Sequence, residues 1–296
     1  MMDRASRARL SVVASMCIFG TIGILRRFLP VPSSFLAMLR GLLGALFLLL
    51  LLRLRGKRLS RADVRANLWK LCLSGSLIGV NWILLFEAYR LTSVATATLC
   101  YYMAPVFVLI AAPFVLRERL TRRKLVCIVA ALFGMVLVSG VTRAGFSGSS
   151  EWRGVLLSLC AAVLYAVVVL LNKFIHGMAA YDKTILQIGT AGAVLLPYVL
   201  LTEELSAISF TPSVVALLLV AGLVHTGFAY SLYFGSMDDL PAHTLALLSY
   251  LDPVVAVVLS ALLLREPMSA AEASGAALIL CAAIVAELPE RTQAHT

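Results

Sequence analysis

The stretch that decides the fold runs from Trp82 to Thr121 and has the sequence WILLFEAYRLTSVATATLCYYMAPVFVLIAAPFVLRERLT. A second stretch, from Tyr230 to Ser269, has the sequence YSLYFGSMDDLPAHTLALLSYLDPVVAVVLSALLLREPMS. A shift of 148 residues aligns the two without a gap, and ten of the forty positions are identical. Both contain a proline followed thirteen residues later by a glutamate, which are Pro105 and Glu118 in the first stretch. The chain therefore contains an internal repeat.

The composition predicts a membrane protein without a soluble domain. Of the 296 residues, 61% are apolar or aromatic and 14% are charged, whereas soluble proteins average about 45–50% and about 25%. The sequence has no G-x-x-x-x-G-K-S/T run, which excludes an ATP site of that type. The six cysteines are scattered singly and the basic residues lie in short loops, so we predict neither a disulfide framework nor a nucleic-acid surface.

Ten apolar segments predict ten transmembrane helices, because a bilayer-spanning helix needs about 20 mostly apolar residues. The segments cover residues 10–29, 34–52, 71–91, 93–116, 125–141, 154–172, 184–201, 213–234, 241–264 and 270–288. Since each half contributes five spans, an odd number, the second half must enter the membrane in the opposite orientation. The predicted fold is an all-α integral membrane protein built from two inverted five-helix repeats, residues 1–145 and 146–296.

The distribution of Lys and Arg predicts the orientation. With the N-terminus inside, the cytoplasmic segments hold 18 of these residues and the outer segments hold 6, and Arg40 within a span completes the 25. Because short cytoplasmic loops retain positive charge, we expect both termini to be cytoplasmic in a multi-pass protein of the cell membrane.

The two stretches, each with its mid-helix proline and terminal glutamate, resemble the paired EamA domains of the drug/metabolite transporter superfamily. The resemblance covers essentially the whole chain and includes Arg40 in the second span. It implies ten helices, cytoplasmic termini and movement of small metabolites, often outward. An acidic residue just before the second proline also recurs in relatives. The resemblance does not imply a substrate, since relatives carry amino acids, cations, nucleosides and sugars.

Asp252 is the first candidate site residue because it lies midway along the ninth span, where an ionisable side chain is costly and faces a cavity or a partner. His225 lies at similar depth in the eighth span, and a carboxylate beside an imidazole changes protonation near neutral pH. Their repeat equivalents, Ala104 and Leu77, are apolar. We therefore predict proton coupling by Asp252 and His225; the alternative is a structural hydrogen bond for Asp252 and a packing role for His225.

Pro105 and Pro253 each predict a kink, because proline removes a helix hydrogen bond and frees the carbonyl four residues earlier. Those carbonyls belong to Tyr101 and Ser249. A hinge that presents backbone oxygens to a cavity and a kink needed only for packing are both compatible with this pattern.

Arg40 and Glu87 lie at matching depth in the second and third spans. A pair between them would close an outer gate, or Arg40 would bind a substrate carboxylate with two hydrogen bonds. The alternative is that Arg40 extends to the lipid headgroups and that Glu87 pairs structurally. Glu118 and Glu266 end their spans, and we interpret them as residues that fix a turn or an interface.

Aromatic side chains follow helical spacing on the third span, at Trp82, Phe86 and Tyr89, and on the eighth, at Tyr230 and Tyr233. Repeat symmetry places these faces opposite each other, and such a wall suits an amphipathic metabolite or an organic cation. The alternative is a location at the membrane interface. The candidate substrate-binding residues are Arg40, Trp82, Phe86, Tyr89, Tyr101, Tyr102, Tyr230, Tyr233 and Ser249.

Together these features predict a secondary transporter that exports small metabolites, in particular amino acids or related amphipathic solutes, by alternating access in exchange for protons. The alternative is an uncoupled facilitator or an uptake carrier for organic cations, nucleosides or other small solutes. The sequence contains neither H-E-x-x-H nor G-x-S-x-G, so we predict no enzyme activity, cofactor or metal site. The expected partners are a small-molecule substrate and the lipid bilayer, without nucleic acid, and the oligomeric state is open.

Overall fold

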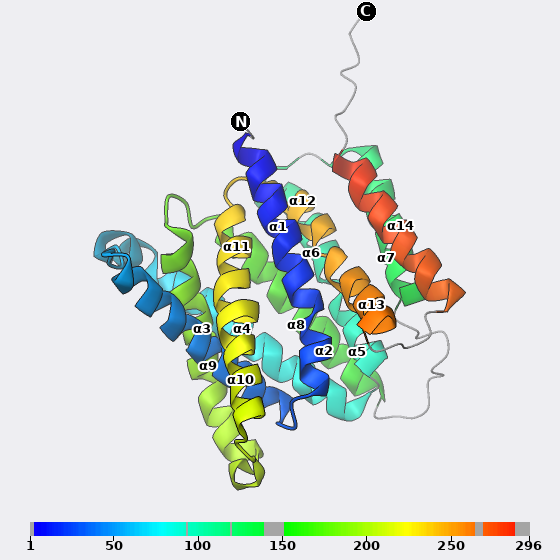
Figure 1. Ribbon diagram of the computed structural model, residues 1–296. Coiled ribbons are helices and arrows are strands. Elements are labelled where there is room, and N and C mark those ends of the chain that lie inside the picture. The colour runs from blue at the N-terminus through cyan, green and yellow to red at the C-terminus, as the bar shows by residue number, and fades with distance from the viewer. Residues whose placement is uncertain (1–2, 93, 119, 139–150, 264–268, 288–296) are drawn as a thin grey trace, which may run out of the picture.

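The computed structural model describes residues 3–92, 94–118, 120–138, 151–263 and 269–287, and these residues form a bundle of helices with no strand (Figure 1). The helices are α1 (Arg4–Gly20), α2 (Ile22–Arg27), α3 (Ser33–Leu54), α4 (Arg61–Leu91), α5 (Val94–Tyr101), α6 (Ala104–Val115), α7 (Arg122–Val138), α8 (Glu151–Asn172), α9 (Ala180–Thr202), η2 (Leu205–Ala207), α10 (Pro212–Val220), η3 (Ala221–Phe228), α11 (Ala229–Ser236), α12 (Ala242–Leu248), α13 (Leu251–Leu263) and α14 (Ala270–Glu287).

Eight helical segments of the described chain are long and apolar enough to cross a membrane. They are Arg4–Arg27, Ser33–Leu54, Arg61–Leu91, Thr96–Val115, Trp152–Asn172, Ala180–Thr202, Pro212–Ser236 and Ala242–Leu263. The remaining two predicted segments are also helical, as α7 and α14, and these two helices pack against each other. The all-helical membrane fold is thus confirmed.

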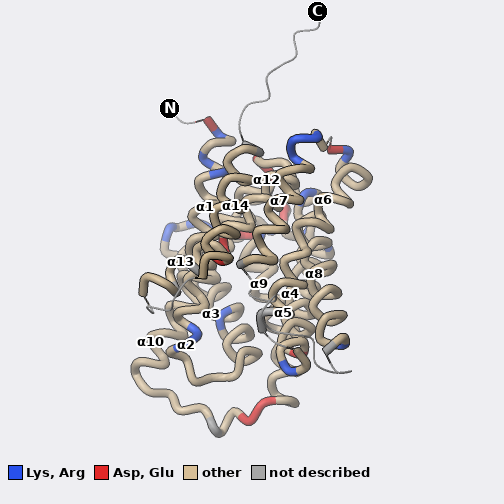
Figure 2. Tube along the Cα trace, turned by 90° about the vertical axis from the view of Figure 1, so that its right-hand side faces the viewer, with Lys and Arg blue, Asp and Glu red and all other residues tan. Residues whose placement is uncertain are grey.

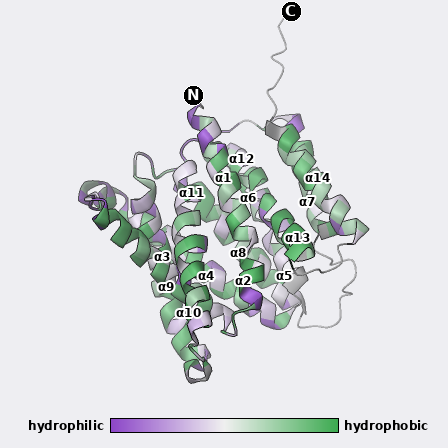
Figure 3. Ribbon diagram, viewed as in Figure 1, coloured by the Kyte–Doolittle hydropathy of each residue, from purple (hydrophilic) through white to green (hydrophobic). Residues whose placement is uncertain are grey.

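Most of the helices are apolar along their length (Figure 3), and many large apolar side chains are exposed, which fits a lipid environment. Phe114 and Leu201, for example, are 84% and 85% exposed. Soluble monomers rarely expose large contiguous apolar patches, whereas side chains of this kind contact lipid when the helices span a bilayer. Figure 2 places Lys and Arg mainly toward the two ends of the bundle, with most of the length between them uncharged.

Several spans are interrupted near their middle. The chain leaves regular α-helix at Thr21, between α1 and α2, at Tyr102 and Met103, between α5 and α6, and at Ser249 and Tyr250, between α12 and α13. At the two prolines the interruption is a short turn within one span, in which the Tyr102 N–H still bonds the Thr98 carbonyl and the Ser249 N–H the Leu245 carbonyl. Each proline stands in the first turn of a new helix, where its missing N–H group costs nothing.

A different interruption lies between α10 and α11, where residues Ala221–Phe228 form a π-helix, η3. Two of its glycines allow close contact with α3: a Cβ on Gly222 would lie 2.6 Å from the Leu43 Cβ, and one on Gly227 would lie 3.0 Å from the Phe47 ring. The wider turn and the two glycines bring α3 and the eighth span together at the level of the site.

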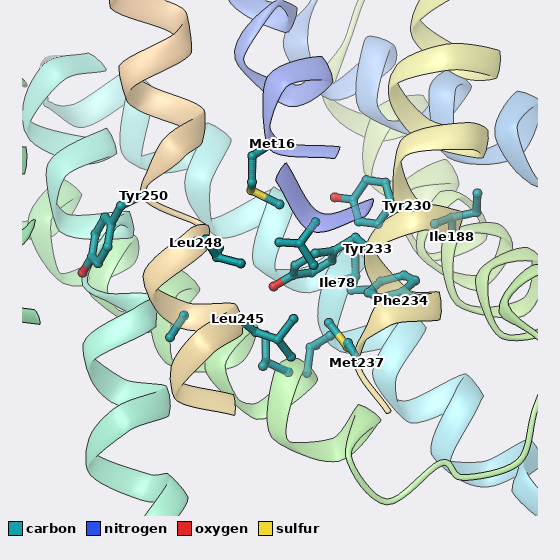
Figure 4. Close-up of a cluster of buried hydrophobic side chains, with 14 of the residues drawn as sticks. Met16, Ile78, Ile188, Tyr230, Tyr233, Phe234, Met237, Leu245, Leu248 and Tyr250 are labelled. Carbon is teal, nitrogen blue, oxygen red and sulfur yellow. The ribbon is translucent and has the colours of Figure 1, made fainter. Parts of the chain in front are cut away.

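Aromatic and aliphatic side chains from several spans fill the middle of the bundle (Figure 4). Tyr230, Tyr233 and Phe234 of α11 are at most 8% exposed, and they pack with Met16 of α1 and with Leu245 and Leu248 of α12 in one cluster. The first span and the end of the eighth span are thus held around a common core. We call the end of the bundle at which α1 begins the N-terminal end and the opposite end the far end.

Candidate functional site

The breaks at Tyr102 and Tyr250, which occupy equivalent positions in the repeat, contact each other. The Tyr250 hydroxyl donates a hydrogen bond to the Tyr102 backbone carbonyl at 3.2 Å, and the Tyr102 hydroxyl donates to the Asp252 carboxylate at 3.0 Å. Backbone that leaves the helix exposes polar groups, and in a membrane such backbone is tolerated only inside protein or along a water-filled cavity. The two breaks therefore place polar groups at the centre of the bundle.

Asp252 is the second residue of α13, in its first turn. This position is favourable for a carboxylate, because the N-terminal end of a helix carries partial positive charge. The first span comes close to the same point, since a Cβ on Gly20 would lie 2.8 Å from the Asp252 carbonyl oxygen. Asp252 as a whole is half-buried, and its carboxylate is bonded to the Tyr102 hydroxyl.

Arg40 extends from α3 into the same region. Its guanidinium carbon lies 4.9 Å from the centre of the Trp82 ring, a cation–π distance. Its Nε is buried and has no hydrogen-bond partner in the described part of the chain. Arg40 also interacts electrostatically with Asp252 and Tyr230. We call Arg40, Trp82, Tyr102, Tyr230 and Asp252 the central site.

The structure does not bring together Arg40 and Glu87, the two residues of the predicted gate. Glu87 accepts hydrogen bonds from Arg90, at 3.3 Å, and from the Tyr198 hydroxyl. Matching depth in neighbouring spans does not fix the direction in which a side chain points around its helix. Glu87 points toward α9, whereas Arg40 stacks on Trp82.

His225 lies in η3 and is 5% exposed. Its Nε2 is 2.7 Å from the Thr21 hydroxyl oxygen, and that hydroxyl in turn donates to the Ile18 carbonyl at 2.7 Å. The other ring nitrogen, Nδ1, lies 3.4 Å from the Val220 carbonyl oxygen within the same π-helix. The structure thus bonds His225 to the break of the first span, while Asp252 bonds Tyr102, so the two residues predicted to act side by side have separate partners.

The predicted aromatic faces meet at one pair of rings. Trp82 and Tyr230, which are equivalent in the repeat, are T-shaped with centroids 6.5 Å apart. Phe19 of α1 packs edge to face on Tyr230 at 5.0 Å. Tyr101 packs against Tyr102 at 6.3 Å. These rings surround the charged groups of the central site.

The other predicted residues lie beside the central site or between it and the far end. Phe86 and Tyr89 continue the wall toward the far end, with ring centroids 6.4 Å apart. Tyr233 is 1% exposed and belongs to the packed cluster. The Ser249 hydroxyl donates to the Leu245 carbonyl of its own helix at 2.8 Å. Tyr233 is therefore part of the packed core, whereas Ser249 is half-buried with its hydroxyl bonded within its own helix.

A pocket of about 240 Å³ opens at the far end, next to Phe86 and Tyr89. Its rim contains Arg90 and Glu203, which are joined at 2.8 Å, and Glu203 also accepts from the Ser34 hydroxyl at 2.5 Å. Together with Glu87 and Tyr198, these residues form what we call the far-end network. It ties α3, α4 and α9 together.

Polar contacts also hold the N-terminal end, around the connection between α11 and α12, residues 237–241. The Lys173 ammonium donates to the carbonyls of Met237, at 2.6 Å, and Leu240. Asp238 and Asp239 lie 3.4 Å from the Lys183 Nζ and 2.8 Å from the Arg4 Nε, respectively. Burial lowers the pKa of Lys173, although nearby carboxylates including Glu118 and Asp238 oppose this shift.

Glu118 completes this attachment from the end of the first stretch. Its carboxylate accepts from the Ala242 N–H at 2.9 Å and from His243 Nδ1 at 3.0 Å. Burial alone would raise the pKa of Glu118, but these hydrogen bonds hold it below its usual value. The interface role predicted for Glu118 agrees with these contacts, whereas Glu266 lies outside the described residues. We call Arg4, Glu118, Lys173 and Lys183 and their partners the N-terminal network.

The sequence reasoning missed several residues that shape the site. Asn81, fully buried, donates to the Ala161 carbonyl and accepts from the Tyr101 hydroxyl at 3.4 Å. Tyr165 of α8 packs on Tyr101 at 5.9 Å. A polar Asn within an apolar span was a signal for the first, but Thr21 and Tyr165 have no pattern that separates them from other small or aromatic residues in a helix.

Comparison with known proteins gives consistent results over nearly the whole chain. The model of the EamA-like transporter family matches residues 7–140 and 152–287. An uncharacterized transporter YxxF of Bacillus subtilis (strain 168) is 31% identical over 255 residues, which cover 86% of this chain and 81% of that protein. Protein PecM of Dickeya dadantii (strain 3937) is 29% identical over 281 residues, covering 92% and 89%. A protein of known crystal structure has the same fold, with a TM-score of 0.84 at 22% identity over 95% of this chain and 96% of that one.

Proposed function

The chain belongs to the EamA-like transporter family, and from that premise we propose that it exports small amphipathic metabolites, amino acids or their relatives, in exchange for protons. It is a membrane transporter, as its relatives are. The proposal concerns what it carries, in which direction and with which coupling.

The observation that carries the proposal is the presence of two opposite charges, Arg40 and Asp252, beside the same group of aromatic rings. Arg40 reaches the centre from α3 with an unbonded Nε, and Asp252 reaches it from α13 with a single tyrosine partner. Trp82 and Tyr230 lie between the two halves of the bundle. A solute with a carboxylate, an amino group and an apolar body would match Arg40, Asp252 and the rings, respectively.

Asp252 is the proposed proton carrier. A carboxylate inside a low-dielectric bundle favours its neutral form unless it is paired, and Tyr102 supplies one hydrogen bond that remains possible in both protonation states. Solute and proton would then occupy Asp252 in turn. His225 follows the movement of the first span through Thr21 and assists in this exchange.

Alternating access is the proposed mechanism, with the two polar networks as its gates. The N-terminal network closes one end, while the pocket beside Phe86 and Tyr89 gives partial access from the far end. The helix breaks next to Pro105 and Pro253 are the proposed hinges, because residues outside regular helix absorb backbone rotation at low cost. Because the proposed export moves solute from the N-terminal end to the far end, solute would leave past Tyr89 and protons would enter by the same route.

The proposed topology has ten membrane crossings, with α7 and α14 as the fifth and tenth. Residues 1–145 and 146–296 form the two inverted halves, both termini are cytoplasmic, and the N-terminal end of the bundle faces the cytoplasm of the cell. The excess of Lys and Arg in the predicted cytoplasmic segments supports this orientation. The chain works without catalysis, cofactor or nucleic acid.

An uncoupled facilitator or an organic-cation carrier is the second candidate. It is favoured by the separate bonding of Asp252 and His225, since Asp252 has a structural partner in Tyr102. An organic cation would use the same aromatic wall and Asp252 without need of Arg40.

The test is solute-driven proton movement in liposomes that contain the purified protein and a pH-sensitive dye. Amino acids, organic cations and nucleosides are added outside in turn, with protein-free liposomes as the control. A lumenal pH change with amino acids alone supports the proposal. Solute uptake without a pH change indicates a facilitator. A pH change with organic cations alone would mean that the substrates are organic cations and not amino acids.

A further inference from the structure

The turn between α3 and α4 is strongly basic and structurally fixed. Between residues 53 and 65 the chain has six Lys and Arg and one acidic residue, Asp63. Gly56 adopts a φ of +68°, a left-handed conformation that ends α3, and the Lys57 N–H donates to the Leu52 carbonyl at 3.0 Å. The Ser60 N–H donates to the Asp182 carboxylate at 3.0 Å, which attaches the turn to α9.

An open pocket of about 750 Å³ lies at this turn. Four cationic side chains line it together with apolar ones: Arg53, Lys57, Arg58 and Arg61, with Leu49, Leu52, Leu59 and Val64. None of the four cations is paired with a carboxylate in the described part of the chain. The only acidic residue of the turn, Asp63, does not line the pocket. The pocket therefore carries a concentrated positive charge above an apolar floor.

The pocket is continuous with apolar surface that faces outward. Leu46, Leu50 and Leu54, spaced one helical turn apart on α3, are 62%, 54% and 76% exposed. Trp69 of α4 is 62% exposed, as is typical of a side chain at a membrane interface. At the left of Figure 3 the apolar ribbon of α3 leads directly into the hydrophilic turn. A ligand here meets cations at one side and hydrocarbon at the other.

We infer that the pocket between α3 and α4 binds one anionic phospholipid, with its phosphate among Arg53, Lys57, Arg58 and Arg61 and its acyl chains along the outer face of α3. Basic pockets beside transmembrane helices on the cytoplasmic side suit anionic headgroups. The apolar floor and the exposed leucines favour a lipid over a free phosphate ion. This inference does not depend on the transported solute.

The test measures binding of fluorescent phosphatidylglycerol to the purified full-length protein in detergent, with fluorescent phosphatidylcholine as the neutral comparison. The pocket variant is Arg53→Gln/Lys57→Gln/Arg58→Gln. The matched control, Arg7→Gln/Arg65→Gln/Arg122→Gln, removes the same charge from exposed residues at the N-terminal end that do not line the pocket. Thermal unfolding confirms that each variant is folded.

We expect the pocket variant to bind phosphatidylglycerol at least about tenfold more weakly, since each basic residue near an anionic lipid contributes to its attraction, and the control to change less than about twofold. The conservative variant Arg53→Lys/Arg58→Lys should retain binding. Equal losses in the pocket variant and the control would overturn the site in favour of diffuse surface charge. Equal binding of phosphatidylcholine, or displacement of phosphatidylglycerol by millimolar inorganic phosphate, would overturn the lipid assignment.

Discussion

The stretch from α4 to α6 and the stretch from η3 to α13 have the same plan: a long helix, a short connection, a helix that breaks at Tyr102 or Tyr250, and a new helix that begins next to a proline. They differ in what they place at the centre. α4 is one α-helix of 31 residues, whereas the eighth span contains the π-helix with His225. The first stretch has Ala104, 2% exposed, where the second has Asp252.

This difference distinguishes residues that build the fold from residues that are proposed to carry protons. The breaks at Tyr102 and Tyr250 recur in both stretches and hold each other, so they belong to the architecture. Asp252 and His225 both belong to the second stretch, and their equivalents in the first are apolar. This is expected if the protein has one site for ionisable groups and not one in each half. π-Helical turns are uncommon and are found often at functional sites. Changes to equivalent positions in the two stretches should therefore have unequal effects.

The largest effect is expected for Arg40, whose repeat equivalent, Ile188, is apolar and fully buried. Arg40→Gln removes the cation proposed to bind a solute carboxylate. Because hydrogen bonds to charged groups contribute about 1.5–3 kcal/mol, solute binding should weaken by about 10- to 100-fold. Binding of a radiolabelled solute to the purified protein measures this, with Arg65→Gln as the control. Unchanged affinity would remove Arg40 from the binding site.

The comparison is sharpened by the matched pair Tyr102→Phe and Tyr250→Phe. The first removes a hydrogen bond to the Asp252 carboxylate and the second removes one to a neutral carbonyl. Bonds to charged groups contribute roughly twice as much as neutral ones. Solute-driven proton flux should fall about tenfold with Tyr102→Phe and about threefold or less with Tyr250→Phe. Equal losses would mean that the two tyrosines serve only to join the breaks.

The two ends of the bundle are compared by Lys173→Met and Arg90→Met. The first frees the α11–α12 connection from the N-terminal network and the second frees Glu203 from the far-end network. In a cysteine-free background, Ser249→Cys should react up to about tenfold faster with a membrane-impermeant thiol reagent, from the N-terminal side for Lys173→Met and from the far side for Arg90→Met. Faster reaction from the same side in both variants would contradict the assignment of two gates.

The smallest effect concerns Glu118, at the junction of the two stretches. Its pKa in the folded protein is lowered by hydrogen bonds from His243 and Ala242, which outweigh the opposite effect of burial. Stabilisation by Glu118 is therefore complete above the pKa of the unfolded chain and is lost as pH falls through the lower folded value. The melting temperature should fall by a few degrees between pH 7 and pH 3, and less so in Glu118→Gln. An identical pH profile in the variant would assign the change to other carboxylates.

The helical architecture was predictable because long apolar segments have few alternatives in a membrane. The described residues of every predicted segment are mainly helical, and the family indicated by the repeat is confirmed. Trp82 and Tyr230 meet as their equivalence in the repeat suggested. These conclusions require only the position of each residue along its span, which can be read directly from the sequence.

The direction of side chains around each helix was not predictable in the same way. Arg40 and Glu87 share a depth but point to different neighbours, and His225 is bonded to Thr21 rather than placed against Asp252. The π-helix changes the direction in which the following side chains point around the helix axis, and no local sequence pattern predicts it. The breaks at the prolines also depend on packing between the spans, through Tyr250 and Tyr102.

Proton coupling through Asp252 is the central claim, and Asp252→Asn tests it most directly. In liposomes with an imposed pH gradient, the variant should lose accumulation of the solute against its concentration gradient, while exchange of labelled for unlabelled solute continues. Asp63→Asn, at an exposed residue of α4, is the control and should behave as the unaltered protein does. Undiminished accumulation in Asp252→Asn, driven by the same pH gradient, would contradict the claim and leave Asp252 as a structural partner of Tyr102.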